Sequence, residues 1–149
     1  MSFTVDTKAF EDMQRMIVSH AENVPKAMPK ALKAGADVLV AAHKAELGRM
    51  AKGDRSTGEL QRSIKAGKIR GMKGGDGISV RISPHGNQKH GNSMRGKRDR
   101  VSNAQVGHFL EHGTSKQPAK PWMSSANKKA EKDVVEAMQK AFTEEMEKM

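Results

Sequence analysis

Two long segments of the chain repeat their apolar residues at the spacing of an α-helix. One starts around Pro121-Trp122 and runs to the C-terminus, which makes a helix of about seven turns. Its broad apolar face consists of Met123, Ala126, Ala130, Val134, Ala137, Met138, Ala141, Phe142 and Met149. A helix with one such face is stable only when that face is buried against another element, so the rest of the chain must cover it.

The other long segment begins near Lys26 or Pro29, because proline is tolerated in the first turn of a helix. Its apolar stripe is formed by Met28, Leu32, Ala36, Leu39, Val40, His43, Leu47 and Met50. Gly35 lies inside this helix and costs about 1 kcal/mol relative to alanine, which indicates that something packs closely there. A shorter helix over residues 7–20 is predicted from the same spacing of Phe10, Met13, Met16 and Ile17.

The middle of the chain predicts a small β-hairpin. Residues 64–70 and 77–83 have the composition of strands, and the second alternates apolar and polar residues strictly. The Gly-Gly and Asp-Gly pairs in residues 71–77 favour a hairpin turn over a phosphate-binding loop. Residues 84–100 have no periodicity, and such a long segment is either functional or disordered until it binds a partner.

These elements predict a single α+β domain over residues 1–149. Two N-terminal helices and one long C-terminal helix are expected to pack on a small antiparallel sheet, with a long basic loop at 84–100. The formal net charge of +10 is uneven. Residues 44–73 hold nine Lys and Arg against three acids and 84–100 hold five against one, whereas 128–149 are nearly neutral. A basic middle favours phosphate backbones, anionic lipids or acidic proteins as partners.

The segment His108-Phe109-Leu110-Glu111-His112 matches H-x-x-E-H, the pattern of the inverted zinc metalloproteases. Such a site needs two histidines on one helical face, a glutamate as general base and a further ligand from elsewhere. Gly113 follows at once and is expected to end the helix within the motif, and no acid follows until Glu131. The favoured interpretation is a structural corner in which Glu111 accepts backbone or arginine hydrogen bonds. A small zinc hydrolase is the enzymatic alternative.

No other enzymatic chemistry is supported, so no catalytic residue, cofactor or metal is predicted. The absence of cysteine excludes a disulfide scaffold, a cysteine-based zinc site and thiol catalysis. There is no G-x-S-x-G motif for a nucleophilic serine. The N-terminus does not have the pattern of a signal peptide, and no stretch approaches the roughly 18–20 apolar residues of a membrane span.

The basic loop provides five candidate contacts to DNA or to a partner protein: Lys89, Arg95, Lys97, Arg98 and Arg100. The loop has no aromatic residue that could stack on bases, and no helix-turn-helix or zinc-finger spacing is present. A contact to DNA would therefore be electrostatic and independent of base sequence. A solvated loop and docking on an acidic protein surface are the alternatives.

Three motifs follow one another along the chain. The first, 56–64, reads STGELQRSI, and Thr57 at its start is a candidate cap for a short helical turn over 58–64. The second, 106–114, reads VGHFLEHGT, and the third, 118–126, reads PAKPWMSSA. The residues of these motifs taken as structural sites are Thr57, Gly58, Leu60, Ile64, Glu111, Gly113, Thr114, Pro121, Trp122 and Ala126. Trp122, the only tryptophan, is a candidate either for the core or for an assembly interface.

In this order and spacing, the three motifs resemble the small neck and tail-completion proteins of long-tailed bacteriophages, the lambdoid-type minor tail component family. The resemblance runs from about residue 28 to residue 149. The chain departs from the family pattern at Val106-Gly107, where a tyrosine-alanine pair is usual, and its basic loop is long for the family.

The resemblance implies a structural, non-enzymatic virion protein of the head–tail interface, present in the host cytoplasm before assembly. It implies a homo-oligomeric ring between connector and tail, with other neck, connector and tail proteins as partners. Non-specific contact with phage DNA fits the basic loop, and no membrane is involved. The alternative from a different class is a non-specific, basic nucleic-acid-binding protein of the cytoplasm.

Overall fold

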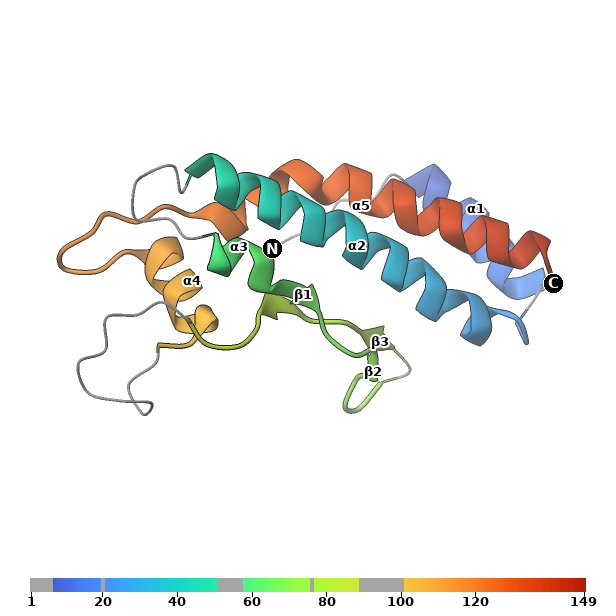
Figure 1. Cartoon of the computed structure of the whole chain (residues 1–149). Helices are drawn as coiled ribbons and strands as arrows, with labels where there is room; N and C mark the ends of the chain where they lie inside the picture. Colours follow the sequence, from blue (N-terminus) through green and yellow to red (C-terminus); the bar gives the residue numbers. More distant parts are fainter. Residues whose placement is uncertain (1–6, 20, 51–57, 76, 89–100) are drawn as a thin grey trace.

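The structure of the chain is a computed structural model that describes residues 7–19, 21–50, 58–75, 77–88 and 101–149. Its helices are α1 (Thr7–Ser19), α2 (Val24–Met50), α3 (Glu59–Ser63), α4 (Asn103–His112) and α5 (Trp122–Glu147). Figure 1 shows α2 and α5 side by side along the molecule, with the strands on the side of α2 away from α5, and α4 lies next to the start of α5. The helices and the small antiparallel strand pairs confirm the predicted α+β class.

Small residues line the contact between α2 and α5. Five alanines of these two helices are buried: Ala27, Ala31 and Ala36 of α2, and Ala126 and Ala130 of α5. A Cβ added at Gly35 would lie 2.5 Å from Cγ of Met138 on α5. The glycine inside α2 therefore allows the two helices to approach closely, as its position in the sequence indicated.

The buried face of α2 agrees with the predicted stripe at Ala36, His43 and Leu47, but it is shifted by one residue in the first half of the helix. Met28 and Leu32 are only half-buried, whereas their neighbours Ala27 and Ala31 are fully covered. The prediction followed the largest apolar side chains, but two helices that pack at short distance meet along their smallest ones. The larger residues then lie beside the contact rather than in it.

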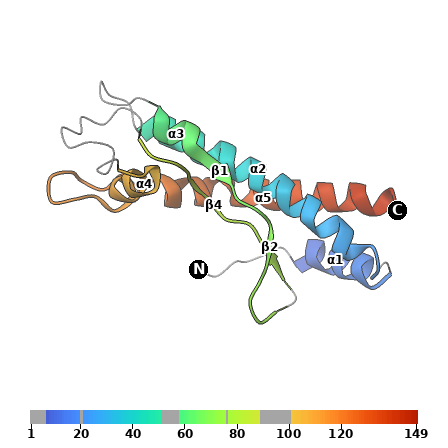
Figure 2. The same cartoon turned by 60° about the horizontal axis from the view of Figure 1, so that its bottom comes forward.

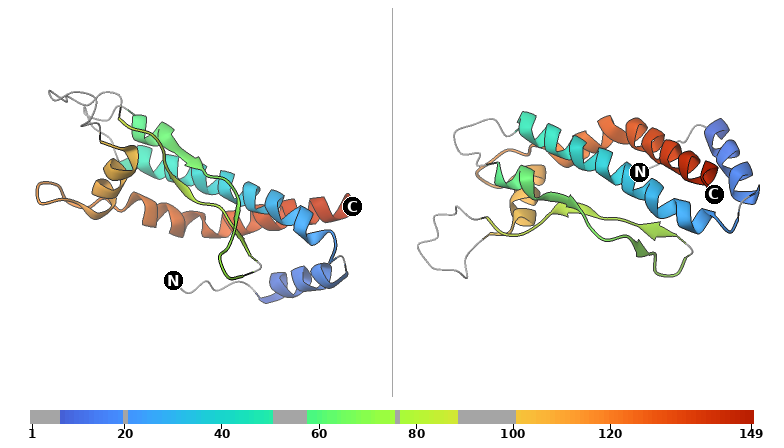
Figure 3. Two further views of the ribbon diagram at one scale, coloured as in Figure 1. Left: turned by 90° about the horizontal axis from the view of Figure 1, so that it is seen from below. Right: turned by 45° about the vertical axis from the view of Figure 1, so that its right-hand side comes forward.

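Eight of the buried apolar residues form two clusters, one toward each end of the α2–α5 pair. The first contains Ala27, Ala31, Phe142 and Met146, and Met13 of α1 packs against it. The second contains Leu47, Leu60, Ile64 and Trp122. The first cluster explains why α1 lies beside the ends of the long helices, and the second joins α2 and α5 to α3 and the first strand (Figure 3).

The strands form a twisted two-stranded ribbon. Near the helices, β1 (Ile64–Ala66) pairs antiparallel with β4 (Ile82–Pro84), and further out β2 (Arg70–Gly71) pairs with β3 (Ile78–Ser79). Figures 2 and 3 show the distal half, with β2 and β3, diverging from the helices. The inner half packs mainly on α2, α3 and α4, whereas β2 and β3 mainly contact each other.

The predicted continuous strands 64–70 and 77–83 are each broken into two pieces. Ala66 pairs with Ile82 but Arg70 pairs with Ser79, so the register shifts by one residue between the two halves. Lys68 and Ile69 consequently stand opposite Val80 alone, which is the residue count of a β-bulge. A bulge increases the local twist, and this accounts for the change of direction between the inner and distal halves.

The basic segment 84–100 is structured at its start, which the sequence did not indicate. Pro84 ends β4, Asn87 forms an antiparallel bridge with Ser102, and the backbone N–H of Gln88 donates to the carbonyl of Val101 at 3.0 Å. These contacts close the base of the loop against the beginning of α4. Residues 89–100, with the five candidate cations Lys89, Arg95, Lys97, Arg98 and Arg100, lie outside the described residues.

Candidate assembly site at the junction of the three motifs

The three sequence motifs meet around Trp122. This side chain is completely buried and packs with Leu60 and Ile64 of the first motif. Its indole N–H donates a 3.1 Å hydrogen bond to the carbonyl of Gly107 in the second motif. Trp122 therefore belongs to the core of the chain, which decides between the two roles that the sequence left open.

Gly107 lets α4 lie directly against this tryptophan. A Cβ added there would meet Trp122 Cζ2 at 3.2 Å and Pro84 Cγ at 3.3 Å, which is tight on both sides. The neighbouring Val106 is half-buried and packs on the same cluster. The Val106-Gly107 pair, where the family pattern has tyrosine-alanine, thus has a packing role.

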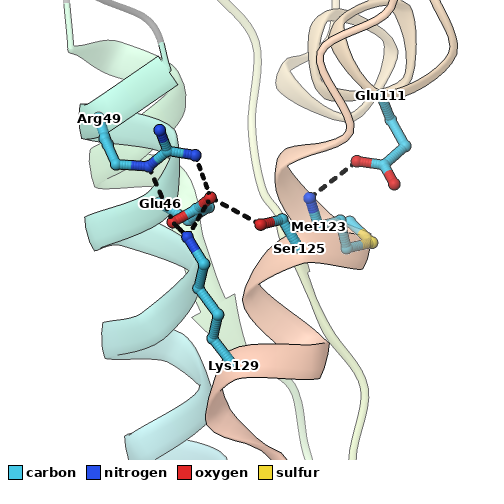
Figure 4. Close-up of polar contacts among 6 residues, drawn as sticks. All are labelled: Glu46, Arg49, Glu111, Met123, Ser125 and Lys129. Atoms are coloured by element: carbon cyan, nitrogen blue, oxygen red, sulfur yellow. Dashed lines mark hydrogen bonds and ion pairs between the residues drawn. The ribbon is translucent and has the colours of Figure 1, made fainter.

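Glu111 caps the N-terminus of α5 from a different helix (Figure 4). Its carboxylate accepts the backbone N–H of Met123 at 2.7 Å and that of Ser124 at 3.1 Å, and also the Ser124 hydroxyl. The N-cap residue of α5 is Pro121, which offers no side-chain acceptor. The remote carboxylate therefore supplies the acceptor that these N–H groups otherwise lack within the helix.

Partial burial raises the pKa of Glu111, but the hydrogen bonds from Ser124 and from the two backbone N–H groups outweigh it, so the pKa lies below its usual range. The ionised form is also favoured by the positive end of the α5 dipole. These are the backbone hydrogen bonds expected from the sequence. No arginine donates to Glu111 among the described residues.

Gly113 and Thr114 form the corner between α4 and α5. Gly113 has φ +75°, its N–H donates to the carbonyl of Phe109 at 2.8 Å, and a Cβ there would lie 2.7 Å from the nitrogen of Ala119. Thr114 makes an antiparallel bridge with Gln117. Only glycine fits this left-handed, crowded position, so the chain turns here toward α5.

The helix that carries H-x-x-E-H is longer than predicted. α4 includes both His108 and His112 and ends only after the motif, so the expectation that Gly113 breaks the helix within it was wrong. The two imidazole rings lie 4.5 Å apart between centroids. The described residues bring no further His, Asp or Glu to this pair, and Glu111 is engaged with α5. The arrangement is that of a helix cap next to two neighbouring histidines.

Glu46 on α2 ties the two long helices together, and the sequence interpretation missed it. It is 6% exposed and accepts from Arg49 Nη2 at 2.6 Å, from Ser125 Oγ at 2.7 Å and from Lys129 Nζ at 2.9 Å (Figure 4). Hydrogen bonds from Arg49, then Ser125 and Lys129, lower the pKa of Glu46 to about 2. The Arg49 contact was detectable as an i,i+3 pair, but the contacts to α5 depend on helix packing.

A second signal that went unused is the capping box of α4. The N–H of Gln105 donates to Ser102 Oγ at 3.1 Å, and the N–H of Ser102 donates to the Gln105 side chain at 3.3 Å. The S-x-x-Q spacing in the sequence predicts this arrangement. At α3 the N-cap is Gly58, with φ +70° and no side-chain cap, while Thr57 lies outside the described residues.

An open hollow of about 540 Å³ lies next to the base of the basic loop. It is lined by Glu59, Arg62, Ser63, Lys65, His85, Gly86, Asn87 and Asn103. The amide of Asn103 donates to the carbonyl of His85 at 2.7 Å and so fixes one wall. Both signs of charge line this hollow, so it has no strong preference for an anion or a cation.

Within the described part of the chain, no helix has the length and apolar character that crossing a membrane requires. No curated protein and no solved structure matches the chain. A sequence model of one family does match, described as "Bacteriophage HK97-gp10, putative tail-component", over residues 11–113. The match covers more than two thirds of the chain and contains the first motif and residues 106–113 of the second, and the structure packs the third against them. The chain therefore belongs to the HK97-gp10-like family of bacteriophage tail components, as the resemblance of its motifs indicated.

Proposed function

We propose that this chain is a structural protein that joins head and tail in a long-tailed phage or prophage by forming a ring between connector and tail. Family membership supports a tail-component role. The proposal that the protein has a structural role and not an enzymatic one rests on the hydrogen bonds of Glu111. Glu111 is the candidate general base of the zinc interpretation, but both of its carboxylate oxygens accept hydrogen bonds from the first turn of α5. The motif that resembles a catalytic site thus acts as a structural brace.

The surface next to this brace has the character of a protein contact. Phe109 on α4 is 44% exposed, and Val101 just before α4 is 42% exposed. Exposed aromatic and aliphatic side chains beside a rigid junction are suited to burial against a neighbouring subunit, where aromatic residues are enriched. We assign this α4 surface to contacts within the ring or with an adjacent neck protein.

The head–tail joining role is tested by deleting the gene from a phage or inducible prophage and examining the lysate by electron microscopy. We expect filled heads and separate tails of normal length, and restoration of whole particles when the chain is supplied in trans. Heads without any assembled tails would instead assign the protein to tail formation. Normal infectious particles would refute a structural role and favour the cytoplasmic nucleic-acid-binding alternative.

The α4 surface is tested with Phe109→Ser in the same complementation. Phe109 is partly exposed and not part of the buried clusters, so the variant should fold with less than about 0.5 kcal/mol change in unfolding free energy. We expect it to yield far fewer joined particles. Val18→Ser is the matched control, because Val18 is 82% exposed on α1, away from the junction. Equal particle yields from both variants would remove the α4 surface from assembly.

The five loop cations, Lys89, Arg95, Lys97, Arg98 and Arg100, remain candidate contacts to DNA or to an acidic ring. Deleting the loop from residue 86 would break the bonds that close its base, so replacing the five cations with glutamine is the cleaner test. Loss of joined particles from that variant would support an assembly role for the loop, and normal joining would exclude one.

A further inference from the structure

The β-ribbon carries five cations that form no ion pair with another described residue. Lys65, Lys68, Arg70, Lys73 and Arg81 are all exposed. None of these five forms an ion pair or a side-chain hydrogen bond with another described residue. The described residues of the ribbon include no acid, and Asp76 in its turn lies outside them. No described acid of the ribbon offsets these five charges, so the ribbon attracts an external anion.

The register shows how the inner cations are directed. Ile64 and Pro84 are a buried cross-strand pair that faces α2, so the next pair, Lys65 and Ser83, faces the opposite side of the ribbon. Arg81 stands across from Gly67, whose N–H donates to its carbonyl at 2.7 Å, and two residues along from Ser83. Lys65 and Arg81 therefore share the outer face of the ribbon, diagonal to each other and away from the helices.

Charge is also distributed unevenly between the two sides of the molecule, with the basic ribbon on one side and the more acidic α5 on the other. The ribbon packs on α2 on the side away from α5 (Figures 1 and 3). α5 holds six acids and four lysines between Trp122 and Glu147. An extended anion is therefore attracted to the ribbon side and weakly repelled by the α5 side.

We propose that the ribbon binds the phosphate backbone of double-stranded DNA without reading its sequence. From Lys65 to Gly71, the end of β2, the strand spans at most about 20 Å, over which a duplex presents about 12 phosphates on its two strands, and Lys73 follows in the turn. A uniform line of charge matches cations spread along the whole ribbon, whereas acidic patches on proteins are local. The major groove, about 12 Å wide, accommodates a two-stranded ribbon. This contact goes beyond the proposed joining role, which requires no DNA contact.

The test measures binding of the full chain to a short random-sequence duplex by fluorescence anisotropy over a range of salt concentrations. We expect a steep negative slope of log affinity against log salt for the wild type. K68Q/R70Q/K73Q should lose affinity by at least about tenfold at low salt and reduce the slope by about 2.7, which is 0.9 for each phosphate released. Circular dichroism checks that the variant is folded.

The matched control is K33Q/K128Q/K140Q, which removes three exposed lysines from α2 and α5 and changes the net charge equally. It should leave the slope within about one unit of the wild type. An equal loss in both variants would reduce the effect to net charge and overturn the proposal. A flat salt dependence of the wild type, or tighter binding to polyglutamate than to DNA, would also overturn it and point to an acidic protein partner.

These outcomes are separable from those of the joining experiment. A ribbon variant that no longer binds DNA but still restores joined particles would leave the joining role intact. A chain that binds DNA through the ribbon but is dispensable for joining would leave the ribbon proposal intact.

Discussion

Glu111 illustrates how one side chain can match a catalytic motif and serve a structural purpose. Its carboxylate reaches from the end of α4 to the first turn of α5, where the proline at the N-cap has no acceptor to offer. The H-x-x-E-H motif alone does not indicate which groups the glutamate contacts in the folded chain. The buried indole of Trp122 and the crowded Gly113 hold α4 and α5 in the orientation that brings the carboxylate to those N–H groups.

Glu111→Ala should lower the free energy of unfolding by about 1–2 kcal/mol, because it removes the cap of α5 and a favourable charge at the positive end of its dipole. Glu111→Gln should cost less, since one acceptor oxygen remains. Urea denaturation followed by circular dichroism measures both. The exposed Glu131 of α5 provides the control, and Glu131→Ala should change stability by less than about 0.5 kcal/mol. A Glu111→Ala chain as stable as the wild type would contradict the capping role.

Gly35 and Gly48 lie in the same helix, but we expect their replacement by alanine to change the stability of the chain in opposite directions. Removing a helical glycine stabilises by about 1 kcal/mol where there is room. At Gly35 the new Cβ would meet Met138 Cγ at 2.5 Å and Val134 Cγ1 at 3.3 Å, so overpacking, which typically costs about 1–3 kcal/mol, should make Gly35→Ala destabilising.

At Gly48 the nearest atom is Nε2 at the end of the Gln61 side chain, so the added Cβ displaces only this side chain and its 2.8 Å hydrogen bond to the carbonyl of Lys44. Gly48→Ala should therefore be more stable than Gly35→Ala by at least about 1 kcal/mol. Thermal unfolding of the two variants side by side measures this difference. Equal stability would mean that α2 and α5 are not as close at Gly35 as the structure shows.

At the scale of elements, α2 and α5 are joined by two kinds of contact. Alanines and Gly35 bring the backbones together, and Glu46 then meets Ser125 and Lys129 across the contact. Arg49 and Lys129 are themselves well exposed, with side-chain exposures of 58% and 60%. Water therefore screens these ion pairs, and the small-residue packing has the larger share in holding the helices together.

The ionisation of Glu46 should make the α2–α5 contact sensitive to acid. Its pKa is about 2 in the folded chain against an ordinary value of 4.5. Unfolding therefore takes up a proton between these values. The stabilisation is fully present above about pH 4.5 and is lost as the pH falls toward 2. Glu111 and Glu145, whose pKa values are also lowered, act in the same direction.

Glu46→Gln should reduce the number of protons taken up on unfolding between about pH 4.5 and pH 2 by up to one. The slope of unfolding free energy against pH in this range measures that number, and it should be smaller in the variant than in the wild type. Glu131→Gln should leave the slope unchanged. A wild-type slope identical to that of Glu46→Gln would show that Glu46 is not engaged with its three partners.

At the scale of the whole molecule, the packed helices contain the hydrophobic cores and the projecting β-ribbon carries exposed cations. The α2–α5 pair provides most of the two cores, which α1, α3 and Ile64 at the start of β1 complete, while the rest of the ribbon projects from them with its cations unpaired among the described residues. The phage tail-component family fits this division, because such a protein needs a stable body and surfaces reserved for neighbours. The exposed Phe109 and the ribbon provide two separate surfaces of different chemistry.

The amino-acid sequence by itself determined α1, α2, α3 and α5, the hairpin turn and the α+β class, because the helices and the turn depend on residues close together in the chain. It also placed the three motifs whose resemblance led to the family. The sequence did not predict the break in the strands, because a bulge depends on which residues pair across the ribbon.

Only the tertiary structure decided which of these residues act together. The contact of Glu46 with Lys129 and that of Glu111 with Met123 each depend on how α5 lies against α2 and α4. That orientation is set by alanines and a glycine, whose spacing signals a close approach without saying which helix approaches. Whether the cations of the ribbon find partners is likewise decided by folding, because acids of the elements that pack beside it, such as Glu46 and Glu111, are hydrogen-bonded elsewhere. Charge and packing between distant segments are properties of the folded chain, because only folding brings those segments within a few ångströms of each other.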